Sequence, residues 1–264
     1  MEKMVEATKD YFPGRREEAK IAFFMDFENI ALGVREAKYK MFEIQKVVER
    51  LVDVGKIVVK KAYADWETYG KYKRPFHEAG IELIDIPRKA YSGKNSADIR
   101  MAVDAMDLCY AKDHIDVFAI ASGDSDFSPL VSKLKENDKH VMGIGVKNSV
   151  SNLLVDNCDE FIYYEDLVRS TAEPRTPAFD KLPEKQKEAF QRVYTAVKAL
   201  QRQDKEIIWG SMVKQTIKRK YPEFNEEYYG YNSFSRLLED AQKKNLLRLE
   251  KDSRSGTYVI HLNE

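Results

Sequence analysis

Residues 117–127 read Val117-Phe118-Ala119-Ile120-Ala121-Ser122-Gly123-Asp124-Ser125-Asp126-Phe127. An apolar run of strand length ends here in a small polar turn that carries two carboxylates. The residues that follow repeat their apolar positions at helical spacing, so we expect a buried parallel strand, a loop and a helix. In open α/β sheets ligands bind beyond the carboxyl ends of the strands, where Asp124 and Asp126 would lie. The alternative is that Asp124 or Ser125 only caps the next helix and Asp126 is solvated.

Strand-like apolar runs alternate with helical patterns up to about residue 168, which predicts parallel βαβ units with right-handed crossovers. The expected strands are 21–25, 57–64, 81–86, 115–121, 140–146 and 161–163. We therefore predict an α/β domain over 21–169, with a Rossmann-like parallel sheet between two helical layers. Residues 1–20 are a lead-in, and the proline-bearing segment 170–183 is typical of a linker.

Residues 184–264 have a different pattern from the first domain. Helical apolar spacing appears in 189–200, 207–217 and 234–246, and two short apolar strands then flank Ser253-Arg254-Ser255-Gly256. Three helices and a hairpin predict a small winged-helix domain.

The composition of the 264 residues is 43% hydrophobic and 33% charged, which suits a substantial core with a soluble surface. No apolar run is long enough to span a bilayer, and residues 1–20 lack a signal-peptide pattern, so we expect a cytoplasmic protein without a membrane partner. Cys109 and Cys158 lie far apart in apolar surroundings, which favours reduced thiols over a disulfide. The four histidines show no ligand spacing, which argues against a zinc site.

The charges are balanced overall but unevenly distributed. The whole chain holds 44 Lys+Arg and 44 Asp+Glu; residues 181–264 hold 17 and 12 of these, which leaves 27 and 32 for the rest. An acidic body joined to a basic tail suits a metal site beside a polyanion-binding domain.

Four aspartates are expected to meet at one edge of the sheet. Asp26 ends the first strand, Asp98 opens a helix, and Asp124 and Asp126 follow the fourth strand. They converge if the first and fourth strands are neighbours, as at a topological switch point. Such a pocket suits Mg²⁺ or Mn²⁺, which can activate water and stabilise charge on a phosphoryl group.

Four motifs stand out along the first domain. They are Asp26-Phe27-Glu28-Asn29, Lys94-Asn95-Ser96-Ala97-Asp98, Ser122-Gly123-Asp124-Ser125-Asp126-Phe127, and Gly145-Val146-Lys147-Asn148-Ser149-Val150-Ser151 followed by Asp159-Glu160-Phe161. They resemble signatures of the NYN family, in particular its LabA-like bacterial branch, within the PIN-like ribonuclease superfamily. The resemblance covers about residues 20–168 and implies a PIN-like fold with metal-dependent ribonuclease activity. By analogy, Asp26, Asp98, Asp124 and Asp126 are the metal-binding catalytic acids, and Asn29 is the family's asparagine after the first strand. Glu28 stands where the family motif varies, so no role is carried over to it.

The second region resembles the LOTUS module, also called OST-HTH, over about residues 184–262. The matching stretches are Ile208-Trp209-Gly210-Ser211-Met212-Val213-Lys214, Phe234-Ser235-Arg236-Leu237-Leu238 and Tyr258-Val259-Ile260. That module is a winged helix that binds RNA or, in some animal proteins, a helicase partner. The resemblance therefore implies RNA or a protein as the partner of the C-terminal domain.

Several further residues are candidates for contact with nucleic acid. Arg88 and Lys94 stand in a basic loop with Tyr91, which either holds a phosphate backbone or is simply solvated. Ser122 either contacts a phosphate or forms the turn, and Lys147 belongs to the fourth motif. Lys218, Arg219 and Lys220 form a basic cluster that suits RNA and equally suits the end of a helix.

These patterns together predict a metal-dependent endoribonuclease with an RNA-binding winged helix. One alternative is a non-catalytic RNA-binding or adaptor protein that keeps the fold. Another is a phosphatase of haloacid dehalogenase type, since Asp26 and Glu28 have its two-residue spacing, although Glu28 is the wrong acid and Asp98 would be idle.

Overall fold

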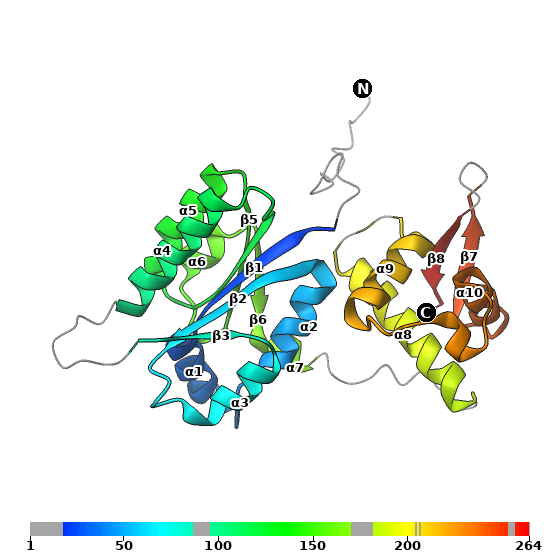
Figure 1. The fold of residues 1–264 in the computed structure, drawn as a ribbon, viewed down its shortest axis with the longest axis horizontal. Helices are drawn as coiled ribbons and strands as arrows, with labels where there is room; N and C mark the ends of the chain where they lie inside the picture. Colours follow the sequence, from blue (N-terminus) through cyan, green and yellow to red (C-terminus); the bar gives the residue numbers. More distant parts are fainter. Residues whose placement is uncertain are drawn as a thin grey trace.

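The computed structural model describes residues 18–86, 96–169, 182–203, 205, 207–252 and 257–263. The first part of the chain forms a six-stranded parallel sheet in the order β3-β2-β1-β4-β5-β6 (Figure 1). Its strands are β1 (Lys20–Asp26), β2 (Lys56–Ala64), β3 (Glu82–Asp85), β4 (Val117–Ala121), β5 (His140–Gly145) and β6 (Glu160–Tyr163). The chain builds outward from β1 to β3 and then returns to the other side of β1, so the predicted switch point lies between β1 and β4.

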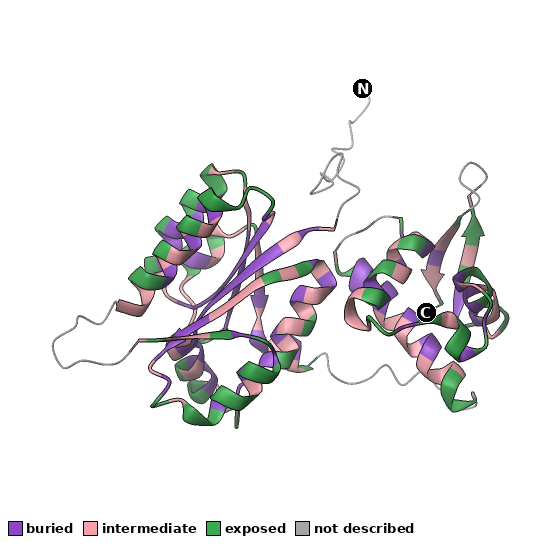
Figure 2. Ribbon diagram, in the orientation of Figure 1, coloured by how far each residue is buried: buried purple, intermediate pink, exposed green. Residues whose placement is uncertain are grey.

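Helices cover both faces of the sheet, as the buried residues of β1 require. Its alternate side chains Ile21, Phe23 and Met25 join one core cluster, and Ala22 and Phe24 join another. The first cluster is closed by α1 (Phe27–Glu36), α2 (Ile44–Val54), α3 (Gly70–Glu78) and α7 (Tyr164–Arg169). The second is closed by α4 (Ser96–Ala111), α5 (Ser128–Glu136) and α6 (Asn152–Asn157). The central strands are almost wholly buried between these layers (Figure 2).

The second part of the chain is a helical domain with a small antiparallel hairpin. It contains α8 (Glu184–Gln201), α9 (Gly210–Lys220), the short η2 (Glu226–Tyr229), α10 (Phe234–Lys243), β7 (Leu247–Lys251) and β8 (Tyr258–Leu262). A single bridge from Trp209 to Val259 ties the start of α9 to the hairpin. Val193, Val213 and Leu237 contribute to a core of its own. The predicted fold class, a parallel α/β sheet followed by a small helical domain with a hairpin, is confirmed.

The two domains meet where the end of α2 faces the end of α9. The ammonium group of Lys220 lies 2.5 Å from the carboxylate of the buried Asp53. Arg219 donates to a carboxylate oxygen of Glu18 at 3.0 Å and to the backbone carbonyl of Asp53 at 2.6 Å. The side-chain amide of Gln203 also donates to that carbonyl. A small set of charge-assisted bonds therefore joins the domains.

Two predictions about composition are also tested by the structure. Cys109 and Cys158 are both free, the first buried and the second half-buried. Among the helices in the described part of the chain, none combines the length and apolar character needed to cross a membrane.

Candidate active site

Asp26 and Ser122 lie side by side because their strands are neighbours. The parallel pairing of β1 with β4 ends at Met25 and Ala121, so the residues that follow them, Asp26 and Ser122, lie at the same edge of the sheet. Asp26 caps α1: one carboxylate oxygen accepts the backbone N–H of Asn29 at 3.2 Å. The other accepts the hydroxyl of Ser122 at 3.1 Å. Asp26 is 5% exposed and Ser122 is fully buried, so this pair forms the floor of the site.

The turn after β4 is held by a chain of short-range hydrogen bonds. The N–H of Gly123 donates to the side-chain oxygen of Asn29 at 2.7 Å. The N–H of Asp124 donates to the hydroxyl of Ser122 at 3.2 Å, and the N–H of Asp126 donates to the carboxylate of Asp124 at 3.0 Å. Asp124 thus caps the short helix η1 (Ser125–Phe127), as the alternative interpretation expects. Capping uses one of its carboxylate oxygens, and the residue stays half-exposed.

The charge state of the site shows that the acids face one another. Burial raises the pKa of Asp26 to about 7; hydrogen bonds from Asn29 and Ser122 oppose this rise, and the charges of Asp98 and Glu28 add to it. Burial also raises the pKa of Asp98 in the first turn of α4, and the charges of Asp124, Asp126 and Glu28 raise it further. The structure therefore brings together all four aspartates named from the sequence. Their role as metal ligands stays a prediction.

Glu28 belongs to this cluster, although the sequence analysis gave it no role. It stands in the first turn of α1, and its carboxylate accepts the backbone N–H of Asp65, just beyond the end of β2, at 3.0 Å. Its charge acts on both Asp26 and Asp98. The local signal was its position two residues after Asp26, but the order of the strands was needed to bring Asp65 beside it.

The donor set fits a hard divalent cation that keeps part of its water shell. All the clustered side chains offer oxygen, the ligand atom that Mg²⁺ and Mn²⁺ prefer. In the described segments no Lys, Arg or His forms an ion pair with Asp26, Asp98, Asp124 or Asp126, and no three His, Cys, Asp or Glu side chains already converge as a closed metal cage. Mg²⁺ usually binds through one or two carboxylates plus water, so an open rim of acids suits it.

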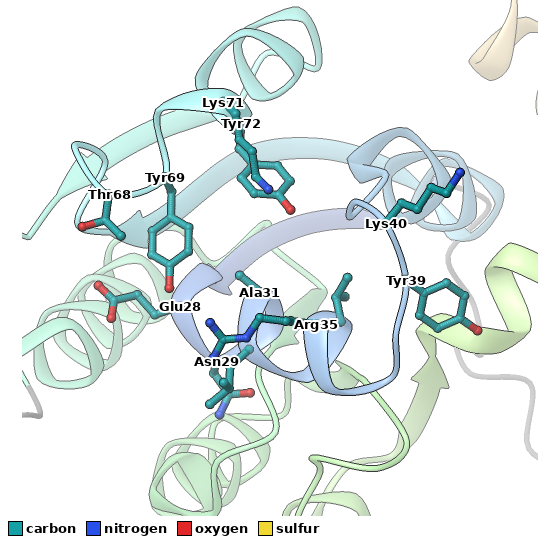
Figure 3. Close-up of a pocket in the computed structure, with 12 residues that line it drawn as sticks. Glu28, Asn29, Ala31, Arg35, Tyr39, Lys40, Thr68, Tyr69, Lys71 and Tyr72 are labelled. Carbon is teal, nitrogen blue, oxygen red and sulfur yellow. The ribbon is translucent and has the colours of Figure 1, made fainter.

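Two hollows adjoin the acids. Asp98 and Asp126 line a depression of about 650 Å³ that also includes Ile99 and Leu153. Glu28 and Asn29 line a groove of about 540 Å³ along α1, which Figure 3 shows. The acid cluster is therefore open to a ligand longer than one phosphate group.

The basic residues named from the sequence have different surroundings. Arg88 and Lys94 lie outside the described residues. Lys147 is exposed beyond β5, and its ammonium lies 5.7 Å from the ring centre of Tyr163 on β6, the strand on the far side of β5 from the acids. Lys218 is exposed at the end of α9.

Arg219 and Lys220 do not lie on an open basic surface. The sequence suggested a basic cluster suited to RNA, but both side chains are largely buried in ion pairs with the first part of the chain, at 13% and 14% exposure. A helical pattern shows which residues share a face but not which domain covers that face. Contact between these two residues and RNA would require the domains to separate.

Comparison with known proteins identifies the family. Residues 20–165 match the NYN domain and residues 190–259 match the OST-HTH/LOTUS domain. Because the first match covers more than half of the chain, the protein belongs to the NYN domain family, whose members have PIN-like nuclease folds. Both family predictions are confirmed.

Two individual proteins agree with this assignment. The chain is 30% identical over 178 residues to an uncharacterized protein of Methanocaldococcus jannaschii, across 66% of this chain and 69% of that protein. Among solved structures, a protein of unknown function from Vibrio parahaemolyticus aligns with a TM-score of 0.52 and 26% identity, over 58% of this chain and 97% of its own. The names of these relatives carry no activity to transfer.

Proposed function

We propose that the protein is a metal-dependent endoribonuclease that hydrolyses RNA phosphodiesters, with a C-terminal domain that binds RNA. The observation that carries this proposal is the meeting of Asp26, Asp98, Asp124 and Asp126 from three separate segments of the chain. Helix capping accounts for Asp26 and Asp124. It does not account for Asp98 and Asp126, whose charges raise the free energy of the folded, metal-free protein.

The side chains divide into a rim and a floor. Asp98 and Asp124 are half-buried, Asp126 is exposed, and these three would hold the cation. A bound Mg²⁺ or Mn²⁺ would supply the Lewis acid that activates a water and stabilises charge on the phosphoryl oxygens. Asp26 is fixed from below by Ser122 and by the N–H of Asn29, so its carboxylate keeps one orientation.

Asn29 is suited to contact the substrate as well. Its side-chain oxygen accepts the N–H of Gly123, and this bond assigns the amide orientation because a backbone N–H can bond only to the oxygen. Its NH₂ group has no acceptor in the described part of the chain. We infer that this group donates to a phosphate oxygen of the RNA.

The alternatives are less well supported. A haloacid dehalogenase mechanism needs Asp26 as an accessible nucleophilic carboxylate, whereas Asp26 is 5% exposed and its pKa is raised to about 7. A non-catalytic RNA-binding protein of the same fold is favoured by one observation, that no closed metal cage exists among the described acids. Cleavage assays distinguish a non-catalytic RNA-binding protein from a nuclease.

The decisive variant is Asp124→Asn in the full chain. Asparagine also caps helices, so η1 should persist while one negative charge is lost. We expect Mn²⁺-dependent cleavage of RNA to fall by about a hundredfold or more, the scale of losing one electrostatic stabiliser of a transition state. Asp107→Asn, which removes an exposed acid from α4 behind Asp98, is the matched control and should cleave normally. Wild-type rates in Asp124→Asn would refute the assignment, and inactivity of the wild type with Mn²⁺ on varied RNAs would support the non-catalytic alternative.

A further inference from the structure

A groove of about 540 Å³ leads away from the acid cluster along α1. Glu28 and Asn29 belong to both, so the groove begins at the proposed site of cleavage. In Figure 3, Thr68 and Tyr69 lie beside Glu28 at one end, and Tyr39 and Lys40 lie at the other, past Arg35. The groove is a direct continuation of the candidate active site.

The charge of the groove is opposite to that of the acids. Arg35, Lys40 and Lys71 line it, and Glu28 at its inner end is the carboxylate among its lining residues. All three cations are exposed, and in the described segments no ion pair joins any of them to a carboxylate. Lys71 also lies over the ring of Tyr72, at 5.0 Å from its centre. Cations that form no ion pair with a carboxylate suit a chain of phosphates, since each contact releases counterions.

The groove also offers aromatic surface that is already ordered. Tyr69 packs edge-to-face on the buried Phe27, with ring centres 5.3 Å apart, and Tyr39 packs similarly on the buried Tyr164 at 5.7 Å. Both tyrosines are half-exposed at the groove. Rings held by the core lose little conformational entropy when a base stacks on them. Leu32, at 43% exposure, adds apolar surface to the groove.

We propose that this groove binds an unpaired stretch of the RNA next to the scissile phosphate, with bases on Tyr39 and Tyr69 and phosphates on Arg35, Lys40 and Lys71. Interleaved cations and aromatic rings are the chemistry of single-strand binding. A duplex keeps its bases stacked inside, where these rings cannot reach them. This inference rests on the proposed nuclease function and adds the surface of this chain that holds the RNA beside the cleaved bond.

Binding is measured with the full chain and a short fluorescent single-stranded RNA in EDTA, where cleavage cannot interfere. Tyr69→Leu should weaken binding by about fivefold or more, the low end of the loss of one stacked base. Tyr69→Phe should keep nearly full affinity because it retains the ring. Arg35→Gln should lower the slope of log affinity against log salt by about 0.7, the value for one phosphate contact on a single strand.

Two control variants lie outside the groove. Arg74→Gln changes an arginine on α3 whose side chain is 89% exposed, and Tyr110→Leu changes a tyrosine on α4 that is 67% exposed. Neither should change affinity or slope. If Tyr69→Leu fails to fold, Arg35→Gln carries the test alone, since its side chain is exposed and takes no part in the core.

The outcomes separate this inference from the proposed function. RNA carrying 4-thiouridine should photocrosslink to peptides that contain Tyr39 or Tyr69, and a matching duplex should bind more weakly than the single strand. Wild-type affinity and salt slope in both Tyr69→Leu and Arg35→Gln would refute RNA binding in the groove but not the proposed nuclease activity. RNA binding in the groove without any cleavage would instead support the groove and refute the nuclease activity.

Discussion

At the scale of single residues, Asp26 serves the fold and the site in conflicting ways. As a cap it accepts hydrogen bonds from Asn29 and Ser122, which favour its ionised form. Its burial, and the negative charges of Asp98 and Glu28, favour the protonated form, and together they raise its pKa to about 7. The metal-free protein therefore carries a destabilising carboxylate at neutral pH.

The pH dependence of stability should reveal this carboxylate. The pKa of Asp26 is raised from 3.8 to about 7 in the folded protein, so between these pH values the folded state binds the extra proton and stability falls as pH rises. Asp26→Asn keeps the cap but removes the titration. In EDTA it should gain stability over the wild type by up to about 4 kcal/mol near pH 8, with little difference near pH 4, by the linkage of about 1.4 kcal/mol for each pH unit.

Chemical denaturation at several pH values measures this difference, and Asp107→Asn is the control. Millimolar Mn²⁺ should stabilise the wild type most near pH 8, because a cation relieves the repulsion among the acids. A constant difference between Asp26→Asn and wild type across this pH range would contradict a raised pKa for Asp26.

Which site residues could be predicted from sequence depends on how local their signal is. Asp26 ends one apolar strand and Asp124 and Asp126 follow another. Parallel strands present their carboxyl ends at one edge, so the strand pattern was enough to name these three residues. Glu28 acquires its place through a bond to Asp65, and Arg219 meets a different domain. Contacts of that kind depend on the packing of distant segments, which periodicity does not encode.

At the scale of elements, the turn after β4 depends on how α1 packs against residues 146–151. A Cβ atom added at Gly33 of α1 would lie 3.0 Å from the Cβ of Val146 and 3.1 Å from that of Ser149. One added at Gly123 would meet the backbone oxygen of Ser149. The N–H of Ser151 donates to the carbonyl of Gly123 at 2.9 Å. Helix, turn and loop therefore form one tightly packed unit around the acids.

Gly33→Ala tests this packing. Alanine improves helix propensity by about 1 kcal/mol, yet here it should destabilise the protein by roughly 1–3 kcal/mol, because the loop must move away from α1. Cleavage should fall too, since the same loop contacts Gly123. Gly70→Ala in α3 is the matched control, because an added Cβ there meets nothing within 4 Å.

A double-mutant cycle identifies the cause of the Gly33→Ala loss. Ser149→Gly removes both the hydroxyl and the Cβ atom that the new methyl group would meet, so combining it with Gly33→Ala should cost less than the sum of the two single changes. Strictly additive losses of unfolding free energy would show that the loop does not limit this position.

The six strands were predicted within about two residues of their observed bounds. The apolar runs of β1, β4 and β5 are buried and have clear ends, and β2, β3 and β6 are shorter or partly exposed apolar stretches between helical patterns. Apolar runs do not reveal the spatial order of the strands. The convergence of the four aspartates could therefore be predicted only on the condition that β1 and β4 are neighbours. The hairpin of the C-terminal domain was predicted from two short apolar stretches around a polar turn. This pattern is local in the sequence, so it can be recognised without knowledge of how the domain packs.

At the scale of the whole molecule, the contact between α2 and α9 joins the two domains through buried charge. Asp53 is 5% exposed and accepts Lys220, while its backbone carbonyl accepts Arg219. Among the described residues, the guanidinium Nε of Arg219 has no hydrogen-bond partner. The apolar clusters of the two domains are separate, so charged and polar groups carry this contact and a single change should open it.

Asp53→Ala should separate the domains rather than unfold either one. Losing one partner of a buried ion pair costs on the order of 3–5 kcal/mol if the other stays buried, and Lys220 can avoid that cost by returning to water. We expect a larger radius of gyration by small-angle X-ray scattering and two calorimetric transitions in place of one. Lys133→Ala, which breaks an ion pair whose side chains are 59% and 58% exposed, should change neither. An unchanged radius of gyration in Asp53→Ala would mean that other contacts hold the domains together.

The joined domains also bear on where a long RNA is cut. If the C-terminal domain binds RNA as proposed, the contacts of Lys220 and Arg219 with the first domain would keep the bound RNA at a constant distance from the acids. Cleavage products should then end at a fixed number of nucleotides from the sequence that the C-terminal domain binds. In Asp53→Ala, where the domains are no longer held together, the same RNA should give products with several neighbouring ends.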